Sequence, residues 1–405
     1  MLKEGTMGGL NQFALWFGAA VSLAEMMTGS LIAPLGLKDG IAVILIGHLI
    51  GTLILALVGI IGFREKNPSL RSSRLSLGRY GSYFISVFNV IQLVGWTAIM
   101  LIQCTRSLQS ITGKLFSFDN FTVLVIATGI IVGIWAFNAH RGINLINNVA
   151  VILLLLLCVV MLKSVLQGGE VQAVASSMTF GAALELSIIM PLTWLPLISD
   201  YTMLGKSKAG SFWGSFGGYF LGSSFMYIIG LLSAIYAGTS DPIGVLVGLN
   251  LGIAAVFIVL LSTVTTTFLD VYSAVLSTSN IAPGISRKHL IIIFTALGTL
   301  LAIFFPMEQY ENFLYMIGSI FAPVFTIILM DYFVYKSDRS MDYFNISGFF
   351  AALTGVVTYY VVAGMDSIIG STIPAMSVTM AVYVLIRFTK KHLILRGDKY
   401  AQQNS

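Results

Sequence analysis

Long apolar segments alternate with short polar connectors along the whole sequence. Runs of about 18 or more apolar residues recur, and each can cross a hydrocarbon core of roughly 30 Å as an α-helix. The two-residue alternation of membrane β-strands does not occur, so a barrel is not expected. We predict twelve spans, at residues 11–35, 41–63, 80–105, 119–139, 145–167, 181–203, 211–237, 251–279, 289–306, 311–334, 346–364 and 367–388.

The composition is that of a membrane protein. Of the 405 residues, 57% are hydrophobic and 10% are charged, whereas a soluble domain has roughly 25% charged residues. The longest connector, about residues 64–79, is a basic loop, so a separate catalytic or nucleic-acid-binding domain is not expected. Cys104 and Cys158 both fall in apolar runs and predict no disulfide framework.

The positions of lysine and arginine predict the orientation, because basic residues near span ends stay on the cytoplasmic side. With the N-terminus inside, all but four of the 22 basic residues lie in cytoplasmic segments. The exceptions are Lys38, Arg106, Lys114 and Lys163. We therefore expect a multi-pass protein of the cytoplasmic membrane, with the lipid bilayer as partner and both termini in the cytoplasm.

Acidic residues inside the predicted spans are the first candidates for function. Glu25, in "SLAEMMTGS", lies in the middle of the first span and Asp270 in the middle of the eighth. Glu185, Asp200 and Asp331 fall nearer span ends, where water is available. An ionisable group at membrane depth is a functional-site hypothesis by default. The alternative is that Glu25 and Asp270 are neutral structural residues, hydrogen-bonded to neighbouring helices.

The eighth span has one polar face. Ser262, Thr266, Asp270 and Ser273 recur there at helical steps of three or four residues. Hydroxyl and carboxylate oxygens are hard ligands, which suits a cation such as Na⁺. Alternatively, each threonine donates to the carbonyl one turn earlier in its own helix. The residues alone leave both interpretations open.

Two spans carry signs of a broken helix. In the sixth, Pro191 and Pro196 each remove an amide donor and clash with the preceding turn. In the first, Thr28 and Gly29 beside Glu25 indicate a second break or a kink. Broken helices at corresponding positions of two halves indicate a transporter's binding site. The two spans are five apart, and a repeated unit of five crossings must be inverted.

Aromatic and amide side chains offer a surface for a flat ring. Trp96 in the third span and Trp194 between the two prolines lie on different helices and could sandwich a ring. Asn89, Gln92 and Thr193 would then face the ring edge. The alternative for both indoles is ordinary aromatic packing.

Small residues in the seventh span predict a close helix contact. Gly214, Gly218 and Gly222 follow one another at four-residue spacing. Without side chains on this face, another helix can approach closely. We expect the stripe to serve packing.

Several of these stretches resemble the nucleobase:cation symporter-1 family, which includes cytosine permeases, hydantoin transporters and allantoin permeases. The match rests on "FGAAVSLAEMMTGS", "IQLVGWTAIM", "MPLTWLPLISDYTMLGKS" and "TTTFLDVYSA" and extends over almost the whole chain. It implies an all-α leucine-transporter-type fold, with two inverted five-helix repeats and two further C-terminal helices. The corresponding divisions are residues 1–168, 169–340 and 341–405.

The resemblance also implies roles for individual residues. The cation would be bound by carbonyls near Val21 and Ala24 and by Ser262, Thr265 and Thr266. The substrate would be bound by Glu25, Gln92, Trp96, Thr193, Trp194 and Asp270. The sequence departs from cytosine permeases in having Leu269 and Asp270 where those have paired asparagines, Pro191 in place of a stacking aromatic, and Glu25 in place of a small or amide residue.

We expect a secondary transporter that imports a pyrimidine with a cation, functions as a monomer and has no cofactor beyond the coupling ion. "SLAEMMTGS" and "LDVYSA" resemble most the branch assigned to hydroxymethylpyrimidine. The threonines favour Na⁺ over H⁺. The alternative is a cytosine/purine or allantoin-type permease coupled to H⁺. An intramembrane enzyme is less favoured, because no His-Glu-x-x-His spacing occurs; a channel is less favoured, because no charge ring is evident.

Overall fold

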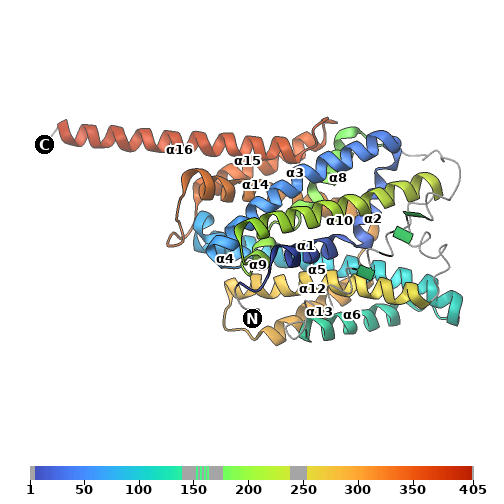
Figure 1. The fold of residues 1–405 in the computed structure, drawn as a ribbon. Helices are drawn as coiled ribbons and strands as arrows, with labels where there is room; N and C mark the ends of the chain where they lie inside the picture. Colours follow the sequence, from blue (N-terminus) through green and yellow to red (C-terminus); the bar gives the residue numbers. More distant parts are fainter. Residues whose placement is uncertain are drawn as a thin grey trace.

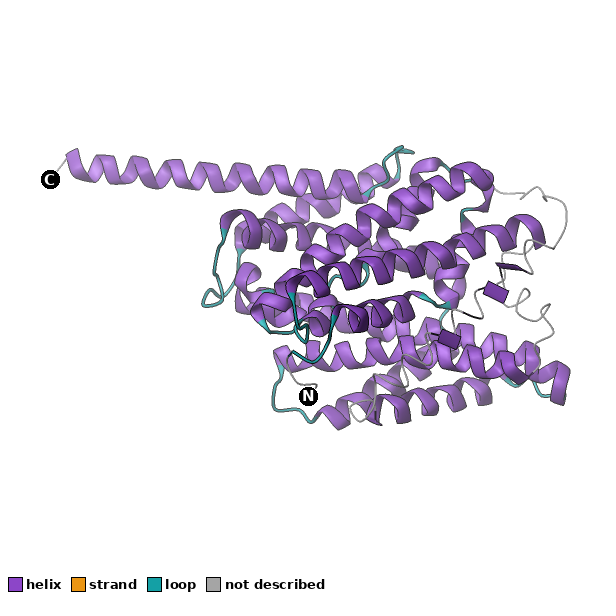
Figure 2. Ribbon diagram, in the orientation of Figure 1, coloured by secondary structure: helices purple, strands orange, loops and turns teal. Residues whose placement is uncertain are grey.

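A computed structural model describes residues 5–138, 177–237 and 253–403, with isolated helical positions between residues 152 and 163. The described chain is almost entirely helical (Figures 1 and 2). Nine helical stretches within these residues are long and apolar enough to cross a membrane. Each predicted span except the fifth coincides with a described helix or pair of helices, and the fifth, 145–167, lies outside the continuous described ranges.

The helices fall into a bundle whose axes run along the same general direction (Figure 1). α16 extends beyond the other helices, and its C-terminal end and the start of α1 lie at the same end of the bundle, with α4 (Figure 1). The described elements are α1 (Gly9–Ala20), α2 (Leu23–Leu31), η1 (Ala33–Leu35), α3 (Gly36–Glu65), α4 (Ser69–Ser72), α5 (Arg74–Phe116), α6 (Phe121–Asn138), α8 (Phe180–Leu192), α9 (Ile198–Thr202), α10 (Lys208–Ala237), α12 (Ile253–Ile281), α13 (Arg287–Phe304), η3 (Met307–Gln309), α14 (Tyr310–Leu329), a π-helical turn (Met330–Tyr335), α15 (Ile346–Ala363) and α16 (Thr372–Gln403).

The first span is broken between α1 and α2, at Val21 and Ser22. Ser22 is extended, and its hydroxyl accepts a hydrogen bond from the Glu25 amide at 3.3 Å, which caps α2. The expected break at Thr28 and Gly29 is wrong, because both residues lie inside α2. Gly29 instead allows close packing: a Cβ there would lie 2.2 Å from the Tyr227 carbonyl oxygen of α10.

The predicted break in the sixth span is confirmed. α8 ends at Leu192 and α9 begins at Ile198, with Pro191 in the last turn of α8 and Pro196 in the connecting turn. The turn is closed by local bonds, from the Trp194 amide to the Pro191 carbonyl at 3.2 Å and from the Ile198 amide to the Trp194 carbonyl at 3.0 Å. The backbone groups released by the break are therefore partly satisfied within the segment itself.

The glycine stripe of the seventh span packs as predicted, and its partner is α1. A Cβ at Gly214 would lie 2.5 Å from the Gly9 carbonyl oxygen, and one at Gly218 would lie 2.4 Å from that of Phe13. α1 and α10 therefore touch backbone to backbone, and the side chains on either side of the stripe face the first span.

A buried acid joins α16 to the rest of the bundle. Asp331, in the π-helical turn, accepts hydrogen bonds from Ser76 of α5 at 2.8 Å and from Tyr383 and Arg387 of α16 at 2.8 and 2.9 Å. It is fully buried, so the expectation that it meets water at a span end is wrong. The Arg387 ion pair and the hydrogen bonds replace hydration.

The other two acids expected near water are buried as well. Glu185 is 3% exposed and Asp200 is 1% exposed. Backbone amides take the place of water at both: Ser69 N donates to Asp200 at 2.8 Å, and Ser371 N and Thr372 N donate to Glu185 at 2.7 and 2.8 Å.

Candidate functional site

The break in the first span is bonded to the polar face of α12. Ser262 Oγ donates to the Val21 carbonyl at 3.0 Å, so two of the residues expected to bind the cation lie together. The Ala24 carbonyl accepts from Thr28 Oγ1 of its own helix at 2.8 Å and from Tyr310 OH of α14 at 3.4 Å. The carbonyls at this break therefore meet hydroxyl groups from two other helices.

The two threonines expected at the cation site differ. Thr265 Oγ1 donates to the Leu261 and Ser262 carbonyls at 2.9 and 3.0 Å, which is the back-bonding alternative. Thr266 Oγ1 is buried and has no hydrogen-bond partner. A buried hydroxyl without a partner costs about 1–3 kcal/mol. Its oxygen fits a cation or water that would supply the missing interaction.

Amide groups connect the sixth-span break to α5 and α12. Gln92 of α5 donates through Nε2 to the Thr193 carbonyl at 3.1 Å and to Asn89 Oδ1 at 2.7 Å. Asn89 in turn donates to Ser277 of α12 at 2.7 Å. Gln92 Oε1 is buried without a partner, whereas the Thr193 hydroxyl donates to the Met190 carbonyl at 2.7 Å. Gln92 and Thr193 thus lie together, and the free acceptor is on Gln92.

Glu25 is held by residues that the sequence interpretation missed. Tyr219 OH and Ser223 Oγ, both on α10, donate to its two oxygens at 2.7 and 2.6 Å. Ser223 also lies 2.6 Å from His48 Nε2 of α3, and His48 Nδ1 lies 2.8 Å from the Ile44 carbonyl. The Glu25 carboxylate is therefore bonded to one neighbouring helix, α10, and is connected to α3 through Ser223. Tyr219 and Ser223 directly follow Gly218 and Gly222 in the sequence, so they lie beside the glycine stripe that faces the first span. This position is the sequence signal that could have identified them as contacts of the first span.

Asp270 has a different environment from Glu25. It is 2% exposed, and its Oδ2 has no hydrogen-bond partner. Within the described residues, no hydrogen bond joins Asp270 to Glu25 or to a partner of Glu25. The shared binding hollow expected between the two carboxyl groups stays a prediction.

The two indoles lie in separate aromatic groups. Trp96 packs edge-on against Tyr310 and Phe313 of α14, with ring centroids 6.2 and 5.6 Å apart. Trp194 packs edge-on against Trp16 and Tyr219 at 5.7 and 6.2 Å. No ring contact joins the two indoles in the described part of the chain. Tyr219 contacts both Trp194 and Glu25, so it connects the sixth-span break to the first span.

Comparisons with known proteins agree with this arrangement. A family model for permeases of cytosine/purines, uracil, thiamine and allantoin matches residues 3–366. The cytosine permease of Escherichia coli (strain K12) is 24% identical over 316 residues, which cover 76% of this chain and 74% of that protein.

Solved structures show the same fold. The closed conformation of Mhp1, a nucleobase-cation-symport-1 family transporter with bromovinylhydantoin bound, has a TM-score of 0.78 at 19% identity, covering 96% of this chain and 93% of Mhp1. A Na⁺-coupled sialic acid symporter in a substrate-bound outward-open state has a TM-score of 0.70 at 15% identity, covering 94% and 88%. The predicted leucine-transporter-type fold is confirmed.

Proposed function

This chain belongs to the family of permeases for cytosine/purines, uracil, thiamine and allantoin, so it is a multi-pass membrane transporter and not an enzyme, and on this premise we propose that it imports a pyrimidine together with a cation. The observation that carries the cation part is the bond from Ser262 to the Val21 carbonyl at the first-span break. Beside it, Thr266 offers a buried, unpartnered oxygen. We propose Na⁺ as the coupling ion, held by Val21, Ala24, Ser262, Thr265 and Thr266.

The substrate part of the proposal rests on acceptor groups. An ionised carboxylate only accepts hydrogen bonds, and Asp270 Oδ2 and Gln92 Oε1 are buried acceptors without partners. A ring that carries amino groups supplies the matching donors. We therefore propose an aminopyrimidine such as hydroxymethylpyrimidine, contacted by Glu25, Gln92, Trp96, Thr193, Trp194 and Asp270. A cytosine, purine or allantoin substrate coupled to H⁺ is the second candidate, and the name of the E. coli relative, a cytosine permease, favours cytosine among these substrates.

The proposed mechanism is alternating access. Residues 1–168 and 169–340 would form the two inverted repeats, and residues 341–405 would contribute the two further C-terminal helices and the tail. The protein would act as a monomer in the cell membrane, with both termini in the cytoplasm. Cation and ring bind from outside, and joint occupancy favours closure and inward opening. Coupling is reciprocal: saturating cation tightens substrate binding by the factor by which substrate tightens cation binding.

Uptake into proteoliposomes tests the proposal. Labelled hydroxymethylpyrimidine, cytosine, a purine and allantoin are offered under an imposed Na⁺ gradient, an imposed H⁺ gradient or neither. We expect hydroxymethylpyrimidine to accumulate only with the Na⁺ gradient. Accumulation of cytosine, a purine or allantoin under the H⁺ gradient alone would establish the second candidate. Equal substrate affinity with and without Na⁺ and across pH would contradict symport altogether.

Two isosteric variants test the acids. Glu25→Gln and Asp270→Asn should each lower uptake about tenfold, the effect of losing one charge-assisted hydrogen bond. The inserted amount should not change. Asp338→Asn, at an exposed position in a connector, is the control and should transport normally. Full activity in both Glu25→Gln and Asp270→Asn would show that neither acid contacts substrate.

A further inference from the structure

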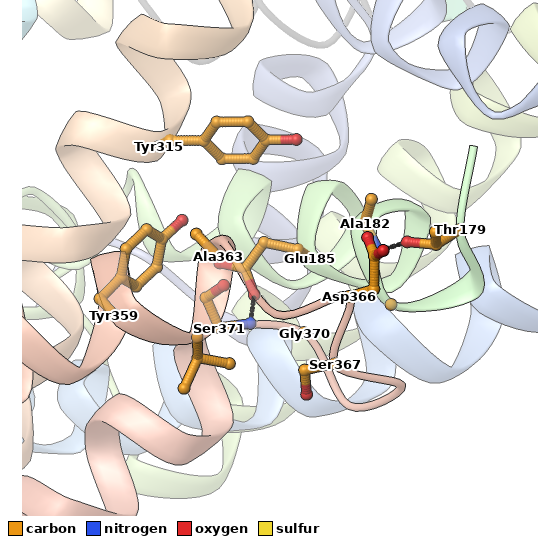
Figure 3. A pocket seen from close by; sticks show the side chains of 12 residues that line it. Thr179, Ala182, Glu185, Tyr315, Tyr359, Ala363, Asp366, Ser367, Gly370 and Ser371 are labelled. Atoms are coloured by element: carbon orange, nitrogen blue, oxygen red, sulfur yellow. Dashed lines mark hydrogen bonds between the residues drawn. The ribbon is translucent and has the colours of Figure 1, made fainter. Parts of the chain in front are cut away.

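A small cavity lies away from the proposed transport site. It is bounded by the start of α8, by α14 and α15, and by the connector from α15 to α16 (Figure 3). Its volume is about 100 Å³, whereas pockets for organic ligands typically measure roughly 300–1,000 Å³. The space suits a small ion with a few waters. None of its lining residues belongs to the proposed substrate or coupling-ion sites.

The charges around the cavity have one sign. Glu185 from α8 and Asp366 from the connector both line it, and its lining contains no lysine, arginine or histidine. Glu185 is 3% exposed, whereas Asp366 is exposed. A cavity with acids of this kind favours a cation, which could enter past Asp366 and be held against Glu185.

An unsatisfied hydroxyl faces the same space. Tyr359 of α15 is 1% exposed, and its hydroxyl lies toward Glu185 without a hydrogen bond of normal length. Figure 3 shows the Tyr359 hydroxyl pointing from the ring toward the side of the cavity where Glu185 lies. A buried hydroxyl is normally satisfied, so this oxygen is available to a ligand bound between Tyr359 and Glu185.

Three hydrogen bonds fix the position of the Glu185 carboxylate. Its Oε2 accepts from Ser371 N and Thr372 N at 2.7 and 2.8 Å, and its Oε1 accepts from Thr372 Oγ1 at 2.6 Å. A carboxylate has about four acceptor positions, so these three bonds leave one on Oε1. The carboxylate is thereby fixed in place and still has capacity for a cation.

Two glycines hold the connector against α8. A Cβ at Gly181 would lie 1.5 Å from the Ser367 carbonyl oxygen, and one at Gly370 would lie 2.6 Å from Glu185 Oε2. The connector and the first turn of α8 are thus in backbone contact, and the cavity is formed before any ligand arrives. A preformed site loses little conformational entropy on binding.

We propose that this cavity is a monovalent-cation site formed by Glu185, Asp366 and the Tyr359 hydroxyl, separate from the coupling-ion site. The ligand is either an alkali ion or a small ammonium ion, since both present one positive charge to oxygen acceptors. A divalent or transition metal is not proposed, because the described residues contain no group of three or more His, Cys, Asp or Glu able to hold one. Binding ties α8, the first half of the broken sixth span, to α15 and the α15–α16 connector.

Thermal unfolding of the purified full-length protein in detergent tests the site without any substrate. NaCl, KCl and methylammonium chloride are compared with choline chloride at equal ionic strength, in a Ser262→Ala background that weakens the proposed coupling-ion site, and the variants below assign the effect to the cavity. We expect at least one salt to raise the midpoint temperature in a saturable way, because a ligand of the native state stabilises it. An effect of NaCl or KCl identifies an alkali ion, and an effect of methylammonium alone identifies an ammonium ligand.

Variants connect the effect to the cavity. Tyr359→Phe, which removes one oxygen, should raise the half-saturating salt concentration about tenfold, as expected for loss of one ligand. Asp366→Asn should also raise the half-saturating salt concentration. Because this position is exposed and lies in a connector, the substitution does not threaten folding. Tyr360→Phe is the matched control, because its hydroxyl bonds to Ser319 instead of facing the cavity, and it should leave the value unchanged.

Two outcomes would overturn the site: no saturable salt effect with Ser262→Ala, or identical salt dependence in Asp366→Asn and Tyr360→Phe. Transport failure is a separate result, because these measurements involve no uptake. A protein that transports nothing from the pyrimidine panel can still show the salt effect, and a transporting protein can lack it.

Discussion

The two broken helices are held open in different ways. The sixth-span break is set by its own residues, since Pro191 and Pro196 prevent a continuous helix and local amide bonds close the turn. The first-span break contains no proline. Its extended Ser22 caps α2, and its Val21 carbonyl accepts from Ser262 on α12.

The difference shows which break can respond to a ligand. A turn imposed by proline persists in any conformation of the bundle. A carbonyl bonded to a hydroxyl of another helix is a contact that a cation can replace or strengthen, and such differential contacts are what shift a conformational equilibrium. We therefore expect cation dependence to be carried by the first break and to be insensitive to the second.

The largest expected effect comes from displacing α1, which carries the first break. Gly218→Ala places a methyl group 2.4 Å from the Phe13 carbonyl oxygen, so α1 must move away from α10. We expect the free energy of unfolding to fall by about 3 kcal/mol, at the upper end of overpacking costs. Gly217→Ala is the matched control, because its methyl group would meet only the Phe13 ring, at 3.6 Å. Calorimetric or denaturant unfolding in detergent gives both values, and equal losses would contradict the close contact.

An intermediate effect is expected from removing the bond between α12 and the first break. Ser262→Ala should raise the Na⁺ concentration for half-maximal uptake about tenfold, because one oxygen ligand is lost. Ser279→Ala on the same helix is the control, since its hydroxyl bonds back to Val275 of its own helix. Uptake is measured against Na⁺ concentration at fixed substrate. An unchanged Na⁺ requirement in Ser262→Ala would place the coupling ion elsewhere.

The smallest effect is expected at the cap of α2. Ser22→Ala removes the acceptor for the Glu25 amide and should cost about 1 kcal/mol of folding free energy, the usual value of an N-cap. Ser233→Ala is the comparison, because Ser233 bonds to the Ile229 carbonyl within α10 and caps nothing. A thermal shift equal in the two variants would show that Ser22 does not hold the break open.

Hydrophobic runs were sufficient to predict most spans, because each helix must be apolar over the membrane thickness. The sixth-span break was predictable because proline acts on its own turn. The place of the first break was not, because Val21 and Ser22 are ordinary helix residues until a hydroxyl 241 positions away bonds to the break. Likewise, the position of the acids near span ends predicts that they are hydrated. The sequence does not show that the amides at the start of α16 donate to Glu185, or that an arginine of α16 pairs with Asp331.

The partners of Glu25 were within reach of the sequence. The glycine stripe marks the face of α10 that touches another helix, and the residues that directly follow its glycines are polar: Ser215, Tyr219 and Ser223. The stripe alone does not show which helix packs against it. That partner follows only from the packing of α1 and α2, so the sequence showed a polar contact surface without its counterpart.

The anchoring of Asp331 sets how far the chain can be shortened from its C-terminus. A truncation before Tyr383 would remove Tyr383 and Arg387 and leave the buried Asp331 carboxylate with the longer Arg339 ion pair, at 3.9 Å, and the hydrogen bonds from Ser76 and Asn345. Trimming the tail beyond Arg387 leaves the Arg387 ion pair intact. Although the matched family region stops at residue 366, the last crossing thus supplies the two closest side chains of α16 to the charge of Asp331.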